Sequence, residues 1–145
     1  MSGISQLFSG MRISSSGMMA ERTRIDTIAE NIANVNSTRT ANGGPYRRKM
    51  VEFAPILEQS RQFGQAPRTQ GVRAVRILED TVTPFEEIID HSHPHADDQG
   101  RVLLPNVSAI MEMTDMVTAM RAYEANLTAQ EGYVRMAERA LQLAR

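Results

Sequence analysis

Cysteine and tryptophan are absent from this chain of 145 residues, which has only three tyrosines and four phenylalanines. Without cysteine there is no disulfide framework, no thiolate metal site and no cysteine nucleophile. The formal net charge of -1 argues against a dedicated nucleic-acid binder, because phosphate contacts need an excess of basic residues. The length limits the chain to one domain or one short elongated subunit.

Long hydrophobic runs are also missing. No apolar run approaches the ~18 residues of a membrane span, so we expect no direct membrane span. The N-terminal residues have neither the charged region nor the apolar stretch of a secretory signal, so we expect no cleaved signal peptide. Methionine is abundant instead, with ten residues, and its flexible side chain fills irregular gaps between helices.

Proline placement divides the chain. All six prolines lie between Pro45 and Pro105, so long helices are possible only before and after that region. We expect an N-terminal helical segment (1–37) with a break near 14–17, where the run Ser14-Ser-Ser-Gly17 is poor in helix formers. We expect a β-rich module over 38–106, with strands near 46–53, 72–78 and 101–104, and a C-terminal helix over 107–145.

Both terminal segments carry apolar residues at seven-residue spacing. The C-terminal rows are the more regular, and Gln130 is their only strongly polar member. The N-terminal rows include Ile25, Ile28, Ile32 and Val35, and the C-terminal rows include Met113, Met116, Met120, Tyr123, Leu127 and Val134. This spacing is typical of a coiled-coil seam. The predicted fold is therefore mainly α with a small β-rich insert, the two terminal helices pairing as a coiled coil.

A pair of helices would leave one flank of each apolar stripe exposed, and exposed apolar stripes require partners. We therefore expect the helices to complete their burial only in an oligomer. Three asparagines near the seam, Asn31, Asn34 and Asn126, are expected to fix the register of the helices, because a buried amide at a helix interface sets alignment.

The near-zero net charge is the sum of two opposed blocks. Residues 39–76 contain eight Arg or Lys against Glu52 and Glu58, whereas residues 77–106 contain seven acidic residues against Arg101. One interpretation is that the two blocks pair within the fold, since charges usually serve local structure. The other is complementarity between neighbouring subunits, which would steer and align an assembly.

Catalytic and metal-binding patterns are weak. His91, His93 and His95 could share one strand face and ligate a metal, but Pro94 and turn residues surround them, which favours a polar surface turn. No nucleophile elbow surrounds Ser14–Ser16, and Gly43-Gly44-Pro45 lacks the rest of a phosphate-binding loop. We expect no enzyme activity, no metal and no cofactor, and we keep a histidine metal-binding protein as an alternative.

The two ends of the chain resemble the paired terminal motifs of the bacterial flagellar basal-body rod family. The N-terminal motif covers residues 18–34 and contains Asn31-Ile-Ala-Asn34, while the C-terminal motif covers residues 112–126. The middle, with Gly44-Pro-Tyr-Arg-Arg48 and His93-Pro-His-Ala-Asp97, is most similar to a short proximal rod protein. The other small proximal rod protein of the family is kept as an alternative.

This resemblance implies a structural subunit of the rod, located in the periplasmic part of the basal body and exported unfolded by the flagellar type III apparatus without signal cleavage. It implies partners among other rod proteins, copies of the chain itself and the adaptor proteins between the rod and the MS ring. It also implies terminal helices that line the inner tube. The residues of consequence would be the seam positions and the three asparagines.

Overall fold

The structure, a computed structural model, describes residues 2–41, 43–58 and 68–143. In chain order its elements are helix α1 (Ser2–Ala33), strands β1 (Lys49–Glu58), β2 (Arg68–Glu79), β3 (Glu86–Ile89) and β4 (Arg101–Leu104), and helix α2 (Ala109–Leu143). The prediction of two long terminal helices around a small β-rich insert is confirmed.

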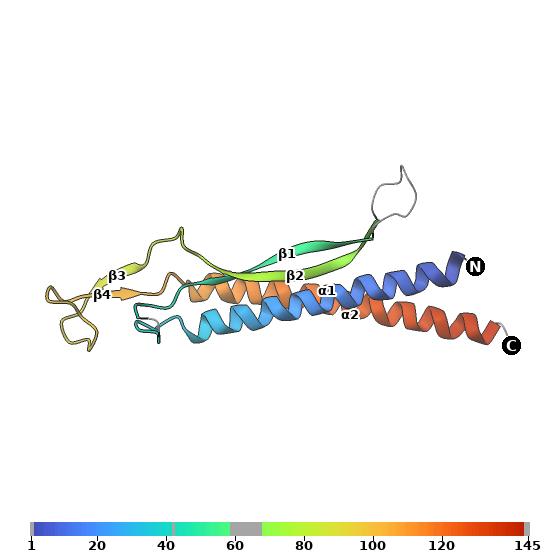
Figure 1. Ribbon diagram of the computed structural model, residues 1–145. Coiled ribbons are helices and arrows are strands. Elements are labelled where there is room, and N and C mark those ends of the chain that lie inside the picture. Colours follow the sequence, from blue (N-terminus) through green and yellow to red (C-terminus); the bar gives the residue numbers. More distant parts are fainter. Residues whose placement is uncertain (1, 42, 59–67, 144–145) are drawn as a thin grey trace.

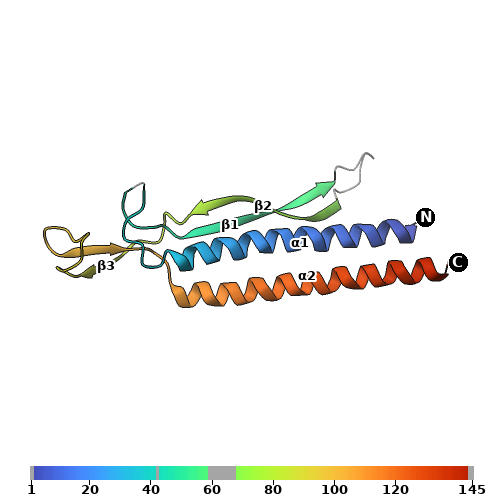
Figure 2. The same cartoon turned by 90° about the horizontal axis from the view of Figure 1, so that it is seen from below.

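The elements form an elongated molecule (Figure 1). Helices α1 and α2 lie side by side and antiparallel, so that both chain ends are at the same end of the molecule (Figures 1 and 2). Strands β1 and β2, which we call the hairpin, run along α1. Residues 86–104, which contain β3 and β4 and which we call the tip, extend beyond the other end of the helices.

Helix α1 is continuous from Ser2 to Ala33, so the expected break near residues 14–17 is wrong. Ser14 and Gly17 are buried, and the Ser16 hydroxyl accepts a hydrogen bond from the Val72 amide of β2 at 3.1 Å. The same hydroxyl donates to the carbonyl of Ile13 at 2.7 Å. Packing of this segment against α2 and the hairpin outweighs its poor intrinsic helix propensity.

The two helices approach each other closely because small residues lie between them. A Cβ atom on Gly17 would lie only 2.8 Å from Oδ1 of Asn126, and a Cβ on Gly10 would collide with the Tyr133 ring. Nearer the tip, Asn31 bonds Glu112. These contacts recur at multiples of seven residues on both helices, which is the interval of coiled-coil contacts. Supercoiled pairing itself stays a prediction.

One predicted apolar row does not face α1, and that part of the predicted seam is wrong. Its members Met113, Met120, Leu127 and Val134 are 38–55% exposed. The row that faces α1 begins one residue earlier and consists of Glu112, Ala119, Asn126 and Tyr133. Ala119 and the polar residues Glu112 and Asn126 let the helices approach, and the large ring of Tyr133 is accommodated because Gly10 opposite it has no side chain. Met116 and Tyr123, from the second predicted row, are half-buried.

The β-rich insert consists of two separate antiparallel pairs among the described residues, β1 with β2 and β3 with β4. The predicted strand segments overlap β1, β2 and β4, whereas β3 was not predicted. The hairpin has register shifts after Glu52 and after Ile56. Pro55 is tolerated in β1 because a two-stranded pair has only edge strands.

The apolar core is small. Its buried members in the described part of the chain are Ala20, Ile28, Tyr46, Val102 and Ala119. Many larger apolar side chains are exposed, among them Met19 on α1 and Ile110 on α2. As far as the structure describes them, neither helix combines the length and the apolarity needed to cross a membrane. Such a small core beside so much exposed apolar surface is typical of a subunit that other chains cover.

The close helix contact predicts opposite effects for two helical glycines. Gly17→Leu forces a side chain into Asn126 and should lower the free energy of unfolding by about 1–3 kcal/mol. Gly132→Ala meets no atom within 4 Å and should raise it by about 0.5–1 kcal/mol, because alanine loses less backbone entropy in a helix. Chemical denaturation of both variants measures the difference. Equal stabilisation by both would contradict the close approach at Gly17.

Candidate assembly interface and its polar junction

A network of buried polar groups joins α1, α2 and β1 at the end of the helices near the tip. Its centre is Asn31, which is 1% exposed. The Asn31 Oδ1 accepts from the Tyr46 hydroxyl and from the Lys49 amide, each at 2.9 Å. The Asn31 Nδ2 donates to the Lys49 carbonyl and to Oε2 of Glu112, again at 2.9 Å. All four hydrogen-bonding positions of the amide are therefore used. We call this network the polar junction.

Glu112 supplies the negative charge of the polar junction. It lies in the first turn of α2, where the helix dipole favours an anion, and it is fully buried. Its Oε1 accepts from Nε of Arg48 at 2.6 Å. The Arg48 guanidinium also donates to Oδ2 of Asp115 at 3.3 Å, and Asp115 lies 3.8 Å from Arg24 of α1. The buried carboxylate is thus compensated by a charge and by an amide.

Asn106 extends the polar junction to the segment that leads into the tip. Its Oδ1 accepts from the Arg48 amide at 2.8 Å, and its Nδ2 donates to the carbonyls of Asp80 and Thr83, both at 3.1 Å. Arg47 donates to the same Asp80 carbonyl at 3.0 Å. The Asn106 side chain thereby connects the residues just before β1 to those just after β2.

The environment of Tyr46 keeps its hydroxyl protonated. Burial, followed by the charges of Glu30, Glu112 and Glu79, raises the pKa of Tyr46 to about 12. Each of these effects disfavours the phenolate. The hydroxyl therefore remains a donor to Asn31 throughout the neutral range.

The three predicted asparagines differ in what they contact. Asn31 bonds across the two helices, as described above. Asn34 bonds only near its own turn, to the Glu30 carbonyl and to the Ser37 hydroxyl. Asn126 packs against Gly17 and donates to the Ala122 carbonyl of its own helix. A role in register is therefore supported most directly for Asn31, and it stays a prediction for all three.

Several members of the polar junction were not predicted as site residues, among them Tyr46, Arg48, Asn106 and Glu112. Two signals were present, because Tyr46 and Arg48 belong to Gly44-Pro-Tyr-Arg-Arg48 and Glu112 opens the C-terminal motif. A charged residue at a seam position is normally assigned to the solvated face. Burial of Glu112 depends on its partner Arg48, which lies 64 residues away in the sequence, and no local pattern reveals that partner.

The outer surface of α2 carries an apolar stripe, which Glu124 and Glu131 interrupt in its second half. Its members are spaced by three, four or seven residues, and each is more than a third exposed: Ile110, Met113, Val117, Met120, Leu127 and Val134. The α1 members of the predicted interface are less accessible. Ile28 is 5% exposed, and Ile25, Ile32 and Val35 are half-buried. Among the predicted interface residues, those on α2 therefore leave the most apolar surface for another chain.

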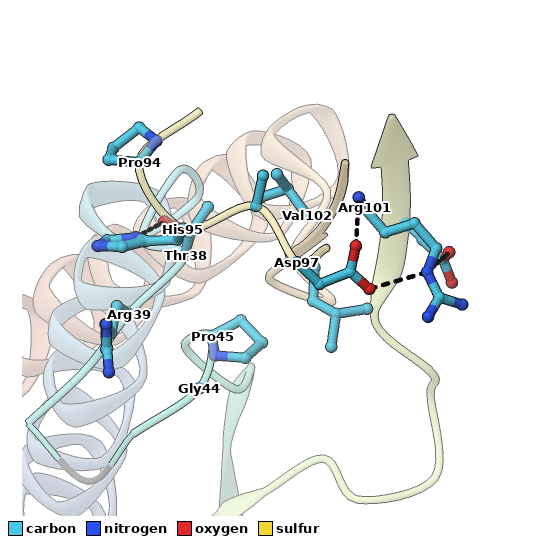
Figure 3. Close-up of a pocket in the computed structure, with 12 residues that line it drawn as sticks. Thr38, Arg39, Gly44, Pro45, Pro94, His95, Asp97, Arg101 and Val102 are labelled. Carbon is cyan, nitrogen blue, oxygen red and sulfur yellow. Dashed lines mark hydrogen bonds and ion pairs between the residues drawn. The ribbon is translucent and has the colours of Figure 1, made fainter. Parts of the chain in front are cut away.

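The histidine cluster builds a turn of the tip. Nδ1 of His95 lies 2.9 Å from the Thr38 hydroxyl, and Nδ1 of His93 accepts from the His95 amide at 3.1 Å. His95, Asp97 and Arg101 are among the residues that line a groove of about 650 Å³. In Figure 3 His95 lies on one side of the lining residues and the Asp97–Arg101 ion pair on the other. Within residues 2–41, 43–58 and 68–143, no three His, Cys, Asp or Glu side chains are grouped so that they could hold a metal ion. The geometry favours a structural turn over the metal-binding alternative.

An antiparallel pair of terminal helices, a β insert and an apolar stripe left on the outside define an assembling axial subunit. Comparison with known proteins places this class in the flagellum. The family described as "Flagella basal body rod protein" matches residues 11–39. The family described as "Flagellar basal body rod FlgEFG protein C-terminal" matches residues 98–143. The two matches cover α1 from residue 11 onward and the whole of α2, the elements that form the helix pair.

Curated relatives identify the branch of this class. The flagellar basal-body rod protein FlgC of Borreliella burgdorferi is 42% identical over 84% of this chain and 87% of its own length. FlgC of Bacillus subtilis is 37% identical over 94% of this chain and 97% of its own length. FlgC of Aquifex aeolicus is 40% identical over 85% of this chain and 86% of its own length. The chain belongs to the FlgC family of flagellar basal-body rod proteins, which are structural proteins of the rod.

The polar junction predicts that replacing two neighbouring asparagines with alanine lowers the free energy of unfolding by unequal amounts. Asn31→Ala leaves Glu112, Tyr46 and the Lys49 backbone each short of a buried partner, so the free energy of unfolding should fall by about 2–4 kcal/mol. Asn34→Ala removes only local bonds and should cost less than about 1 kcal/mol. Urea denaturation of the two variants makes the comparison. Equal losses would show that Asn31 is not the centre of the network.

The raised pKa of Tyr46 predicts a specific loss of stability in alkali. The pKa of Tyr46 is about 12 in the folded chain, against 10.0 for the free group. The neutral hydroxyl therefore makes its full contribution to the free energy of unfolding below pH 10, and this contribution is lost as the pH rises to 12. Tyr46→Phe should therefore be less stable than the unaltered chain at pH 8, with the difference shrinking between pH 10 and 12. Denaturation curves across this range test it. A constant difference would contradict the assignment.

Proposed function

We propose that the chain is a proximal subunit of the flagellar rod and that it assembles through its terminal helices into a tubular drive shaft. The shaft transmits motor torque and leaves a channel through which axial proteins pass. The observation that carries the proposal is the apolar stripe on α2, which α1 does not cover. Its seven-residue repeat suits packing against a helix of another subunit.

In this proposal the two rows of α2 have different tasks. The inner row, centred on Ala119 and Asn126, holds α2 to α1 within the chain. The outer row, centred on Met113, Met120 and Leu127, packs against neighbouring subunits as part of a coiled-coil wall. Methionine suits the second task because its unbranched side chain adapts to neighbours of more than one shape. Torque then passes through packed helices.

The role is structural, not catalytic. It is supported by the relatives, which are rod proteins, and by the use of the histidines in a turn. The proposed partners are copies of this chain, other rod proteins, the adaptor proteins between the rod and the MS ring, and the flagellar type III export apparatus. The proposed location is the periplasmic part of the basal body, reached without a cleaved signal peptide.

The proposed interface predicts that Met120→Asp is secreted but does not assemble. Met120 is 47% exposed, so a carboxylate there is solvated in the free chain and folding should be unaffected. In the wall the same charge would be buried without a partner, which is strongly unfavourable. Swimming of a deletion strain that expresses the variant, together with export of the chain into the medium, measures both steps.

Met120→Leu is the matched control, because it keeps the apolar surface and approximate volume. It should swim normally. Circular dichroism of both purified variants should match that of the unaltered chain. Normal swimming by Met120→Asp would contradict the proposed role of the stripe, whereas failure of the unaltered chain to restore swimming would contradict the rod function itself.

A further inference from the structure

Methionine supplies all the sulfur of this chain, which has ten methionines and no cysteine. Five of them lie on α2, at positions 111, 113, 116, 120 and 136. The side chains of Met113 and Met120 are 55% and 47% exposed. An oxidant dissolved in water therefore reaches both thioethers in the free subunit.

Met113 and Met120 differ from a third exposed methionine of α2 in the face that they share. They are seven residues apart, which is about two helical turns, and both belong to the outer row. Met111 is 67% exposed, but it precedes Met113 by two residues and therefore lies about 200° around the helix from it. Exposure is common to the three residues, whereas a place in the proposed interface is not.

Oxidation would change what the outer row can pack against. A peroxide transfers one oxygen atom to the thioether: its O–O bond breaks, an S–O bond forms, the sulfur loses two electrons and the peroxide is reduced to water. The product, methionine sulfoxide, is polar and carries a hydrogen-bond acceptor. Water solvates this oxygen in the free chain. Against the apolar side chains of a neighbouring subunit it would be buried without a donor, which is unfavourable.

We infer that Met113 and Met120 form an oxidation-sensitive site through which peroxide controls the entry of the free chain into the rod. A neighbour that covers the outer row also shields both sulfur atoms, so the site acts before assembly and not after it. Methionine sulfoxide reductases return the sulfoxide to the thioether, which makes the block reversible. This inference rests on the proposed function, because the added oxygen matters only if the outer row is buried in the assembly.

Competition between two chains in one cell tests the inference. A deletion strain expresses the unaltered chain together with the double variant Met113→Leu, Met120→Leu, which keeps the apolar surface and has no sulfur at either position. Residues 102–121 form one tryptic peptide, so mass spectrometry of purified basal bodies gives the ratio of the two chains. When hydrogen peroxide is present from the start of expression, the variant should be enriched by about tenfold or more over untreated cells, because a buried unpaired acceptor weakens the contact. Peroxide damage elsewhere in the cell affects both chains equally.

Two further variants serve as controls. Met111→Leu removes an exposed methionine of α2 that lies outside the outer row, and in the same competition it should show no enrichment. Met113→Gln with Met120→Gln places a permanent polar group at both positions. It should be depleted from basal bodies by about tenfold or more without any peroxide, while its circular dichroism matches that of the unaltered chain.

The outcomes separate this inference from the rod function. An unchanged ratio under peroxide, normal incorporation of the glutamine variant, or equal enrichment of Met111→Leu would each overturn the oxidation-sensitive site and leave the rod function intact. Absence of the unaltered chain from the basal bodies of untreated cells would overturn the rod function instead.

Discussion

The hydrogen bond between Asn31 and Glu112 is the contact on which the rest of this structure depends. It joins the last turns of α1 to the first turn of α2, and Arg48 brings the start of the hairpin to the same carboxylate. A buried charge is tolerated only when it is compensated, so these segments must reach their positions together. Once they do, the seven-residue interval carries the same alignment to Gly17 and Gly10 further along α1.

This constraint separates the tasks of the two sides of α2. Close approach to α1 requires small or polar residues, and the inner row supplies Ala119 and Asn126. The large apolar residues, such as Met120 and Leu127, are then left on the outside. A monomer gains little from that arrangement. A rod subunit gains a stable shape of its own and an apolar surface reserved for its neighbours.

The sequence predicted the fold well and the packing less well, for physical reasons. The confinement of proline to residues 45–105 and the heptad spacing outside it indicated two helices around a β-rich insert. Hydrophobic periodicity then selected the row of Met113 and Met120 as the intramolecular seam, because it weights large side chains. The actual contact uses glycine, alanine and buried polar groups, which that criterion discounts.

The expected break at residues 14–17 failed for the same reason, since the serines and Gly17 that weaken an isolated helix fit this contact. Glu112 and Arg48 could not be paired from the sequence, because only the tertiary fold brings them together.

The central claim is that the outer row of α2 is free in the isolated subunit and covered in the rod. Oxidative footprinting of methionines by mass spectrometry, on the purified chain and on intact basal bodies, tests it directly. Met113 and Met120 should be oxidised rapidly in the free chain and protected in the rod. Met116, half-buried beside α1, should change much less and serves as the internal reference. Equal oxidation of Met113 and Met120 in both states would show that the outer row of α2 is not covered in the rod.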